Sequence, residues 1–187
     1  MRFIKDDEFI RGNCPMTKEE VRMLSVAKLE LEEDYKVIDI GAGSGSVSIQ
    51  IAQICKNGKV IAIEKDEDAL LVLNKNKEKF KTHNLEILNA EAMEIEPSII
   101  EEFDAIFVGG SGGNIADIIE IYGKKLKKNK YIVLNFITIN NVYKAMEALK
   151  GLNYEVECAQ VQVSKGRGQS YMLMANNPIF IVSGKKR

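Results

Sequence analysis

An acidic residue followed by three glycines is the part of this sequence with the clearest chemical meaning. Asp39 stands two residues before Gly41, and further glycines follow at Gly43 and Gly45. Residues 37–40 read as the end of a buried parallel strand, and apolar residues after position 46 recur at helical spacing. Strand, glycine turn and helix form the half-unit that binds adenosine-containing cofactors in α/β folds. Glycine is needed there because a Cβ atom would hold the ligand away from the backbone.

The details of this loop favour S-adenosylmethionine over a dinucleotide. The dinucleotide fingerprint has a glycine three positions beyond its second glycine, where this chain has Ser46. A pyrophosphate would also lie badly beside the charge of Asp39. S-adenosylmethionine has no phosphate and brings a sulfonium, an ammonium group and a ribose, which suit an acid at this position. The alternative, a turn that only packs a helix on the sheet, leaves Asp39 unexplained. We therefore expect this methyl donor to bind at Asp39, Gly41, Ala42, Gly43, Ser44 and Gly45.

Two glutamates follow later strands at positions suited to the rest of the donor. Residues 59–64 read as a second strand that ends in Glu64, roughly 20 residues beyond the glycine loop. Such folds place a carboxylate there on the ribose hydroxyls, although a surface glutamate at a strand end is the alternative. Glu91 lies just past a third strand at 85–88 and is placed to accept a hydrogen bond from the adenine amino group.

A second glycine cluster predicts where an acceptor would approach. Residues 103–108 read as a fourth strand, and four glycines in five residues follow it in the run Gly109, Gly110, Ser111, Gly112, Gly113. At the carboxyl end of a strand this run predicts an open loop beside the cofactor and close approach by a bulky substrate. A flexible turn is the alternative. The polar-Pro-Pro-aromatic tetrapeptide with which many methyltransferases hold a planar amine or base is absent.

Strands and helices alternate along the chain up to residue 151, which predicts an α/β fold. An opening helix runs to about Glu32, with Thr17 as its cap and Glu20 completing a capping box. A fifth strand is expected at 131–137. Residues 154–163 and 171–182 then read as consecutive strands, joined by a turn that carries Lys165 and Arg167.

This order predicts a Rossmann-like class I methyltransferase fold. The expected sheet is seven-stranded and mostly parallel, with an antiparallel C-terminal hairpin and helices on both faces. We expect a single domain over residues 1–187. Within it, residues 1–33 form an N-terminal helical segment, 34–151 the cofactor-binding α/β core and 152–187 the hairpin edge.

The bulk composition fits a soluble globular enzyme, which we expect in the cytoplasm. The 187 residues are 45% hydrophobic and 28% charged, with a formal net charge of −1. With so small a net charge, the protein has no overall electrostatic attraction for nucleic acid or an anionic membrane. The longest apolar runs are too short to span a bilayer, and the charged amino terminus is no signal peptide. Three widely separated cysteines fit reduced thiols, with neither a disulfide framework nor a metal site.

Two tempting features receive no catalytic or nucleic-acid role. The lysines between Lys124 and Lys130 read as the carboxyl end of a helix, where cations complement the helix dipole and no stacking aromatics are interleaved. His83, the single histidine, lies in a polar turn and is expected to be solvated.

Four segments together resemble a known family. They are residues 15–22, the loop 39–45, residues 107–113 and residues 177–180. In these segments the chain resembles the decarboxylating cobalt-precorrin-6B methyltransferases of anaerobic cobalamin biosynthesis, which methylate carbon 15. The glycine loop is common to class I methyltransferases, whereas the first and third segments are more specific.

The resemblance implies a set of ligands and contacts. It implies S-adenosylmethionine contacts at Thr17, at residues 41–45, at Glu64 and around Ala92, and a homotetramer. The acceptor it implies is a tetrapyrrole that is methylated at carbon 15 and loses the carboxyl group of its carbon 12 acetate. Because that macrocycle carries several carboxylates, Lys165 and Arg167 are hypothetical clamps for them. One departure is Glu91, since residues 90–92 read Ala-Glu-Ala where the family usually has Gly-Asp-Ala.

The chemistry implied needs no histidine triad and no metal, because the macrocycle supplies its own nucleophilic carbon and electron sink. No catalytic residue is assigned from the sequence. Three alternatives stay open: a methyltransferase of transfer RNA, a protein carboxyl methyltransferase, and a donor-binding module that does not turn over. Near-neutral charge and the lack of base-stacking aromatics count against the first.

Overall fold

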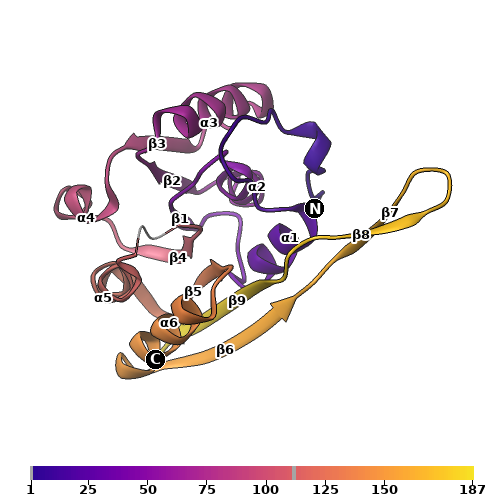
Figure 1. Cartoon of the computed structure of the whole chain (residues 1–187). Helices are drawn as coiled ribbons and strands as arrows, with labels where there is room; N and C mark the ends of the chain where they lie inside the picture. Colours follow the sequence, from indigo (N-terminus) through magenta and orange to yellow (C-terminus); the bar gives the residue numbers. More distant parts are fainter. Residues whose placement is uncertain (1, 111–112) are drawn as a thin grey trace.

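Seven strands form the central sheet of the computed structural model, which describes residues 2–110 and 113–187 (Figure 1). Their order across the sheet is β3, β2, β1, β4, β5, β9, β6. Strands β1 to β5 run parallel, and β9 is antiparallel to both β5 and β6. The predicted class I methyltransferase sheet is confirmed. The strands are β1 (Lys36–Ile40), β2 (Lys59–Glu64), β3 (Leu85–Asn89), β4 (Phe103–Val108), β5 (Leu126–Phe136), β6 (Tyr154–Val161) and β9 (Ile179–Lys186).

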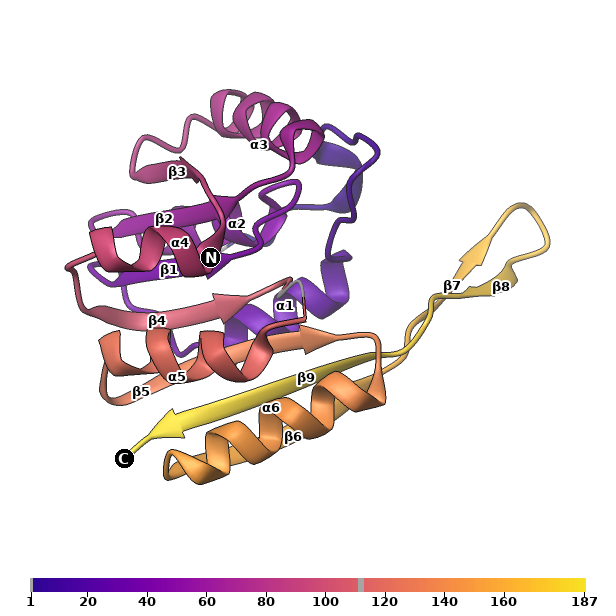
Figure 2. The same ribbon diagram turned by 60° about the vertical axis from the view of Figure 1, so that its left-hand side comes forward.

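Helices cover both faces of this sheet, because both sets of side chains on the central strands are apolar. Val37 packs in a core with residues of α1, α2 and α3, and Ile38 packs in a second core with residues of α4, α5 and α6. Figure 2 shows α4, α5 and α6 along one face of the sheet. The helices are α1 (Glu19–Ala27), α2 (Ser46–Ile54), α3 (Glu67–Phe80), α4 (Ala92–Ile95), α5 (Ile115–Lys125) and α6 (Ile139–Gly151), with 3₁₀ turns η1 (Asp6–Glu8) and η2 (Glu96–Ser98).

Two element boundaries differ from the sequence-based expectation. Helix α1 ends at Ala27, several residues before the expected end near Glu32. Strand β5 begins at Leu126 instead of 131, because Leu126 is fully buried in the core and pairs with Phe103 of β4. Part of the lysine run therefore belongs to a strand, where Lys127 pairs with a β4 carboxylate at 2.8 Å.

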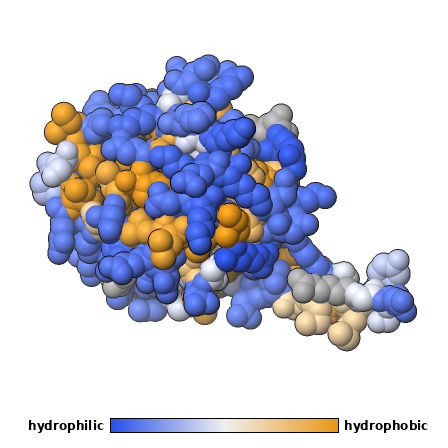
Figure 3. Space-filling view, turned by 90° about the horizontal axis from the view of Figure 1, so that it is seen from above, coloured by the Kyte–Doolittle hydropathy of each residue, from blue (hydrophilic) through white to orange (hydrophobic). Residues whose placement is uncertain are grey.

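The C-terminal hairpin divides into two parts. Strands β6 and β9 complete the main sheet, while β7 (Ser164–Arg167) and β8 (Met172–Ala175) form a separate two-stranded sheet. That outer hairpin stands away from the body of the molecule, and its surface carries apolar side chains (Figure 3). Lys165 and Arg167 were expected on a turn, but they lie in β7, and the connecting turn follows them. The side chain of Arg167 lies outside the described residues.

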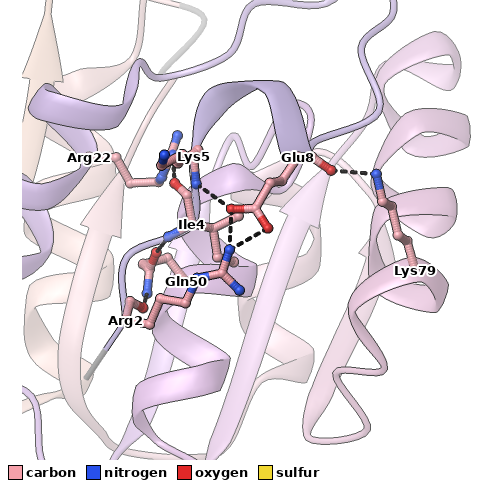
Figure 4. Close-up of polar contacts among 7 residues, drawn as sticks. All are labelled: Arg2, Ile4, Lys5, Glu8, Arg22, Gln50 and Lys79. Carbon is pink, nitrogen blue, oxygen red and sulfur yellow. Dashed lines mark hydrogen bonds and ion pairs between the residues drawn. The ribbon is translucent and has the colours of Figure 1, made fainter.

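The N-terminal segment is fixed to α1, α2 and α3 by buried polar side chains. Arg22 of α1 is fully buried, donates to the Asp6 carboxylate at 3.2 Å and also bonds the Ile4 carbonyl. The Gln50 amide of α2 accepts from the Ile4 N–H at 2.8 Å (Figure 4). Asn76 of α3 bonds both the N–H and the carbonyl of Ile10. These bonds place the following residues, 15–17, above the glycine loop.

None of the helices in the described part of the chain has the length and apolar character that crossing a bilayer requires.

Candidate active site

The two glycine clusters touch each other at the carboxyl ends of β1 and β4. Gly41 adopts φ +71°, and a Cβ atom there would lie 2.6 Å from the Gly110 carbonyl oxygen. The Gly109 N–H donates to the Ile40 carbonyl at 2.9 Å. Gly43, at φ +55°, lies under the carbonyl of Pro15. Glycine is therefore required at position 41 both by its backbone angle and by contact with the second cluster.

A cavity of about 290 Å³ opens above this junction. It lies at the point where the strand order reverses between β1 and β4, which is where open α/β sheets bind ligands. Most of the predicted donor and acceptor positions meet there. They are Thr17, Gly41, Ala42, Gly43, Ser44, Glu64, Glu91, Ala92, Gly109 and Gly110. Gly45 and Asp39 do not line the cavity, and Ser111 and Gly112 lie outside the described residues.

Glu64 holds the glycine loop from the end of β2. Its Oε2 accepts from the Gly43 N–H at 2.7 Å, and its Oε1 accepts from the N–H groups of Lys65 and Asp66 at 2.8 and 3.0 Å. A carboxylate offers about four acceptor positions, so capacity remains for a ligand hydroxyl. The position fits the predicted ribose contact.

Asp39 lies beneath the loop and is fully enclosed. It accepts a hydrogen bond from the Ser48 hydroxyl, and its other oxygen has no partner among the described residues. Burial raises the pKa of the Asp39 carboxyl to about 7, against the lowering effect of Ser48, and the charge of Glu64 raises it further. In this structure Asp39 faces α2 rather than the cavity, so its effect on a donor passes through the loop it supports.

Glu91 and Ala92 form the third side of the cavity. The Glu91 carboxylate caps α4, accepting from the N–H groups of Met93 and Glu94 at 2.6 and 3.3 Å. The buried Tyr122 hydroxyl donates to the Ala92 carbonyl at 2.6 Å and fixes this turn. Tyr122 is not among the residues predicted for the site, because nothing in its local sequence shows that its hydroxyl reaches across to α4.

The capping box predicted for α1 is wrong. The helix begins at Glu19, its N-cap is Lys18, and no side chain caps it. The Thr17 carbonyl instead accepts from Arg22 at 2.7 Å, which keeps Thr17 outside the helix. The Thr17 side chain is therefore free to line the cavity, as the family resemblance implied.

A second cavity, of about 340 Å³, adjoins the first. Pro15, Thr17 and Gly109 line both. The second cavity extends towards α1 and the ends of β5, β6 and β9, and several of its residues were not singled out from the sequence. Its lining includes Met16, Lys18, Glu20, Val21, Asn135, Phe136, Ile137, Val161, Val163, Asn176, Asn177 and Ile179. They come from four separate parts of the chain, 16–21, 135–137, 161–163 and 176–179, so only the folded sheet edge shows them as one surface.

Lys165 reaches this region from the outer hairpin. Its ammonium group lies 2.6 Å from the Glu20 carboxylate of α1. Lys165 is not part of either cavity wall, so a substrate carboxylate would have to compete with Glu20 for it.

The first cavity fits the cationic methyl donor. The glycines provide a floor without Cβ atoms, and Glu64 and Glu91 make the lining acidic, with Lys65 as its single cation. The residues described here contain no cluster of three or more histidine, cysteine or acidic side chains that could hold a metal ion.

Comparison with known proteins decides the family. A family model described as a precorrin methyltransferase domain matches residues 8–186. The chain belongs to this family. A Sulfolobus acidocaldarius protein named as a probable cobalt-precorrin-6B C(15)-methyltransferase (decarboxylating) is 40% identical, covering 98% of this chain and 97% of its own length. A Salmonella typhimurium protein named as that enzyme is 37% identical, covering 98% and 96%.

Solved structures agree with this precorrin methyltransferase assignment. A Geobacter metallireducens precorrin-6y C5,15-methyltransferase superposes with a TM-score of 0.93 at 37% identity, over 99% of this chain and 97% of that one. A Methanobacterium thermoautotrophicum protein described as precorrin 8W decarboxylase gives a TM-score of 0.91 at 28% identity, over 97% and 98%. An Aquifex aeolicus tRNA methyltransferase, at 21% identity and a TM-score of 0.78 over 96% and 72%, shares the fold alone.

Proposed function

We propose that this protein is the S-adenosylmethionine-dependent methyltransferase that methylates carbon 15 of cobalt-precorrin-6B and removes the carboxyl group of the carbon 12 acetate, in anaerobic cobalamin biosynthesis. The observation that carries this proposal is the near full-length identity of 37% and more to relatives named for that reaction. The two adjoining cavities support it, because the reaction brings a donor and a large acceptor together at one carbon atom.

The first cavity is the proposed donor site. Glu64 would receive the ribose hydroxyls, the turn at Glu91 and Ala92 would face the adenine, and the glycine loop would lie against the methionine part. Thr17 closes the site from the N-terminal segment. When bound, S-adenosylmethionine supplies an electrophilic methyl group. The protein's part is to orient the two reactants and exclude water, and positioning alone accounts for a large share of such a rate enhancement.

The second cavity is the proposed site for the reacting edge of the tetrapyrrole. A macrocycle is larger than this cavity, so its remaining face would rest on the rim. Ile137 is 76% exposed and Ile139 is 74% exposed on the turn that opens α6, where they offer apolar surface beside the cavity. Residues 109–112 and the cations Lys165 and Arg167 of β7 remain proposed contacts for the rest of the acceptor.

The state of the protein in the cell is also part of the proposal. We expect a single domain that assembles as a homotetramer in the cytoplasm and binds neither nucleic acid nor membrane. The near-neutral net charge supports the absence of a nucleic-acid partner.

One experiment tests the reaction directly. The purified protein is incubated with cobalt-precorrin-6B and S-adenosylmethionine carrying a labelled methyl group, and products are separated and weighed by mass spectrometry. The proposal requires a product that contains the labelled methyl group and has lost carbon dioxide. Tight donor binding with no turnover of this substrate would contradict it.

A further inference from the structure

Glu20 is the one acidic residue that lines the second cavity in the described part of the chain. Its Oε1 lies 2.6 Å from the Lys165 ammonium group, and its Oε2 is buried with no hydrogen-bond partner among the described residues. The glutamates of the first cavity differ, because Glu64 and Glu91 are occupied by backbone N–H groups. A buried carboxylate oxygen without a partner costs free energy. It indicates a group that receives its partner from outside the chain.

Glu20 lines the cavity that adjoins the proposed donor site. The second cavity shares Pro15, Thr17 and Gly109 with the first, so a macrocycle edge between them would face both the methyl donor and α1. His83, the single histidine of the sequence, is exposed in the turn between α3 and β3 and lines neither cavity.

The proposed reaction, on which this inference rests, leaves one proton to be relocated. Loss of carbon dioxide breaks the bond between the carboxyl carbon and the methylene carbon, and the electron pair stays in the conjugated macrocycle. An electron pair of the conjugated macrocycle forms the new bond between carbon 15 and the methyl carbon. The bond between that methyl carbon and sulfur breaks, and its electron pair stays on sulfur, so the donor leaves as a neutral thioether. No oxidant or reductant is needed. The hydrogen on carbon 15 must leave as a proton, and the former methylene carbon must gain one to become a methyl group.

We propose that Glu20 moves this proton, taking it from carbon 15 and delivering a proton to the side chain of carbon 12, and that Lys165 is a positioning residue that holds the Glu20 carboxylate in the cavity wall. A carboxylate can act first as a base and then, once protonated, as an acid, so that a single group serves both ends of the transfer.

The charges around Glu20 suit the first of these two steps. Burial raises the pKa of the Glu20 carboxyl, but the hydrogen bond and charge of Lys165, with a further contribution from Arg22, outweigh burial and leave that pKa below its usual value. Among the other charged groups, Glu19 and Asp6 both act on Lys165, and Lys18 lines the same cavity as Glu20. Glu20 is therefore ionised at neutral pH and ready to accept a proton.

The first test replaces Glu20 and measures binding and turnover separately. For Glu20→Gln we expect kcat to fall by about 10²-fold or more, as loss of general acid–base catalysis requires. The affinity for the tetrapyrrole without donor, measured by absorbance titration, should stay within about threefold. Glu20→Asp should recover at least about a tenth of wild-type kcat because it keeps a carboxylate. Glu19→Gln, the control on the same turn, should leave kcat within about threefold.

The second test uses the pH dependence of kcat, which a merely structural role would not move. A base at Glu20 predicts that kcat falls on the acid side as this carboxyl becomes protonated. Because Lys165 lowers the pKa of Glu20, Lys165→Met should shift that acid limb to higher pH, whereas Lys165→Arg should keep it near its original place. This measurement stands even if Glu20→Gln does not fold.

The outcomes separate this inference from the proposed function. If the wild-type protein turns over the substrate, either of two results overturns the role of Glu20 and leaves the proposed function intact. The first is Glu20→Gln turnover at the wild-type rate, and the second is an acid limb of the kcat profile that does not move in Lys165→Met. Absence of wild-type turnover overturns the proposed function itself. A loss of tetrapyrrole affinity in Glu20→Gln equal to its loss of kcat would make Glu20 a binding residue and also overturn the inference.

Discussion

At the scale of single residues, the enclosed Asp39 makes a prediction about stability and pH. The ordinary pKa of an aspartate is 3.8, and burial raises the pKa of Asp39 to about 7 in the folded protein. Between these values the folded state binds a proton that the unfolded state has lost, so stability falls as the pH rises through this window and then levels off. At about 1.4 kcal/mol for each pH unit, the ionised carboxyl costs on the order of 4 kcal/mol.

Asp39→Asn removes this titration. We therefore expect Asp39→Asn to become more stable relative to wild type as the pH is raised from about 4 to about 7, because wild type loses stability over this range and the variant does not. Urea unfolding at a series of pH values measures this difference. Ser48→Ala deletes the hydrogen bond that lowers the Asp39 pKa, so the pKa of Asp39 should be higher in this variant. The fall in stability with rising pH should therefore continue to a higher pH in Ser48→Ala than in wild type. A difference between wild type and Asp39→Asn that does not vary with pH would contradict the assignment.

The contact between the two glycine clusters makes a second residue-scale prediction. Gly41 and Gly168 both have φ +71°, but a Cβ atom would lie 2.6 Å from the Gly110 backbone in the first case and would meet nothing within 4 Å in the second. Gly41→Ala should abolish binding of S-adenosylmethionine in calorimetry. Gly168→Ala suffers the same backbone strain, about 1 kcal/mol, and should bind the donor normally. Equal donor binding by the two variants would place the donor elsewhere.

The sequence predicted the parts of the site that depend on local pattern. The glycine loop, the strand ends at Glu64 and Glu91, and the glycines after β4 follow from spacing along single elements, and the structure brings them to one cavity. The second cavity could not be predicted in this way, because Glu20, Asn135 and Asn177 approach one another only through packing of the sheet edge on α1. The capping box failed because the bond from Arg22 holds the backbone of Thr17 outside the helix.

At the scale of elements, the N-terminal segment is the part that joins the fold to the site. Asn76 of α3 is fully buried and connects α3 to two other segments of the chain. Its Oδ1 accepts from the Ile10 N–H at 2.8 Å, and its Nδ2 donates to the carbonyls of Ile10 and Ser44 at 3.0 Å each. One amide therefore holds both the N-terminal segment and the glycine loop.

Asn76→Ala should loosen both at once. Leaving these backbone groups unpaired in a buried place should cost about 3 kcal/mol of stability, and donor affinity should fall by about tenfold as residues 15–17 lose their fixed position. Hydrogen exchange at Ile10 and urea unfolding measure the two effects. Asn74→Ala is the control on the same helix, because its exposed amide bonds only the Leu70 carbonyl at 2.9 Å. If the two variants behave alike, the segment is held by other contacts.

At the scale of the whole molecule, the outer hairpin is the feature that the single chain does not explain. Tyr171, Met172 and Leu173 are 80%, 62% and 71% exposed on β8 and the turn before it. Large apolar side chains gathered on a projecting element are typical of a protein contact surface. The proposed homotetramer would cover them, and it would also hold β7, and with it Lys165, against α1 at the second cavity.

Leu173→Asp should therefore reduce the size of the assembly. A charge placed within a buried apolar contact is strongly unfavourable, so sedimentation at micromolar concentration should show monomers or dimers where wild type forms the larger species. Leu71→Asp on α3, where Leu71 is 61% exposed away from the hairpin, should leave the assembly unchanged.

Because the hairpin carries Lys165, the smaller species should also show a raised KM for the tetrapyrrole with unaltered donor affinity. If Leu173→Asp leaves the assembly unchanged, the hairpin has no part in oligomerisation. If a dissociated variant keeps its KM for the tetrapyrrole, the Glu20–Lys165 pair forms within one chain without contacts from neighbouring chains.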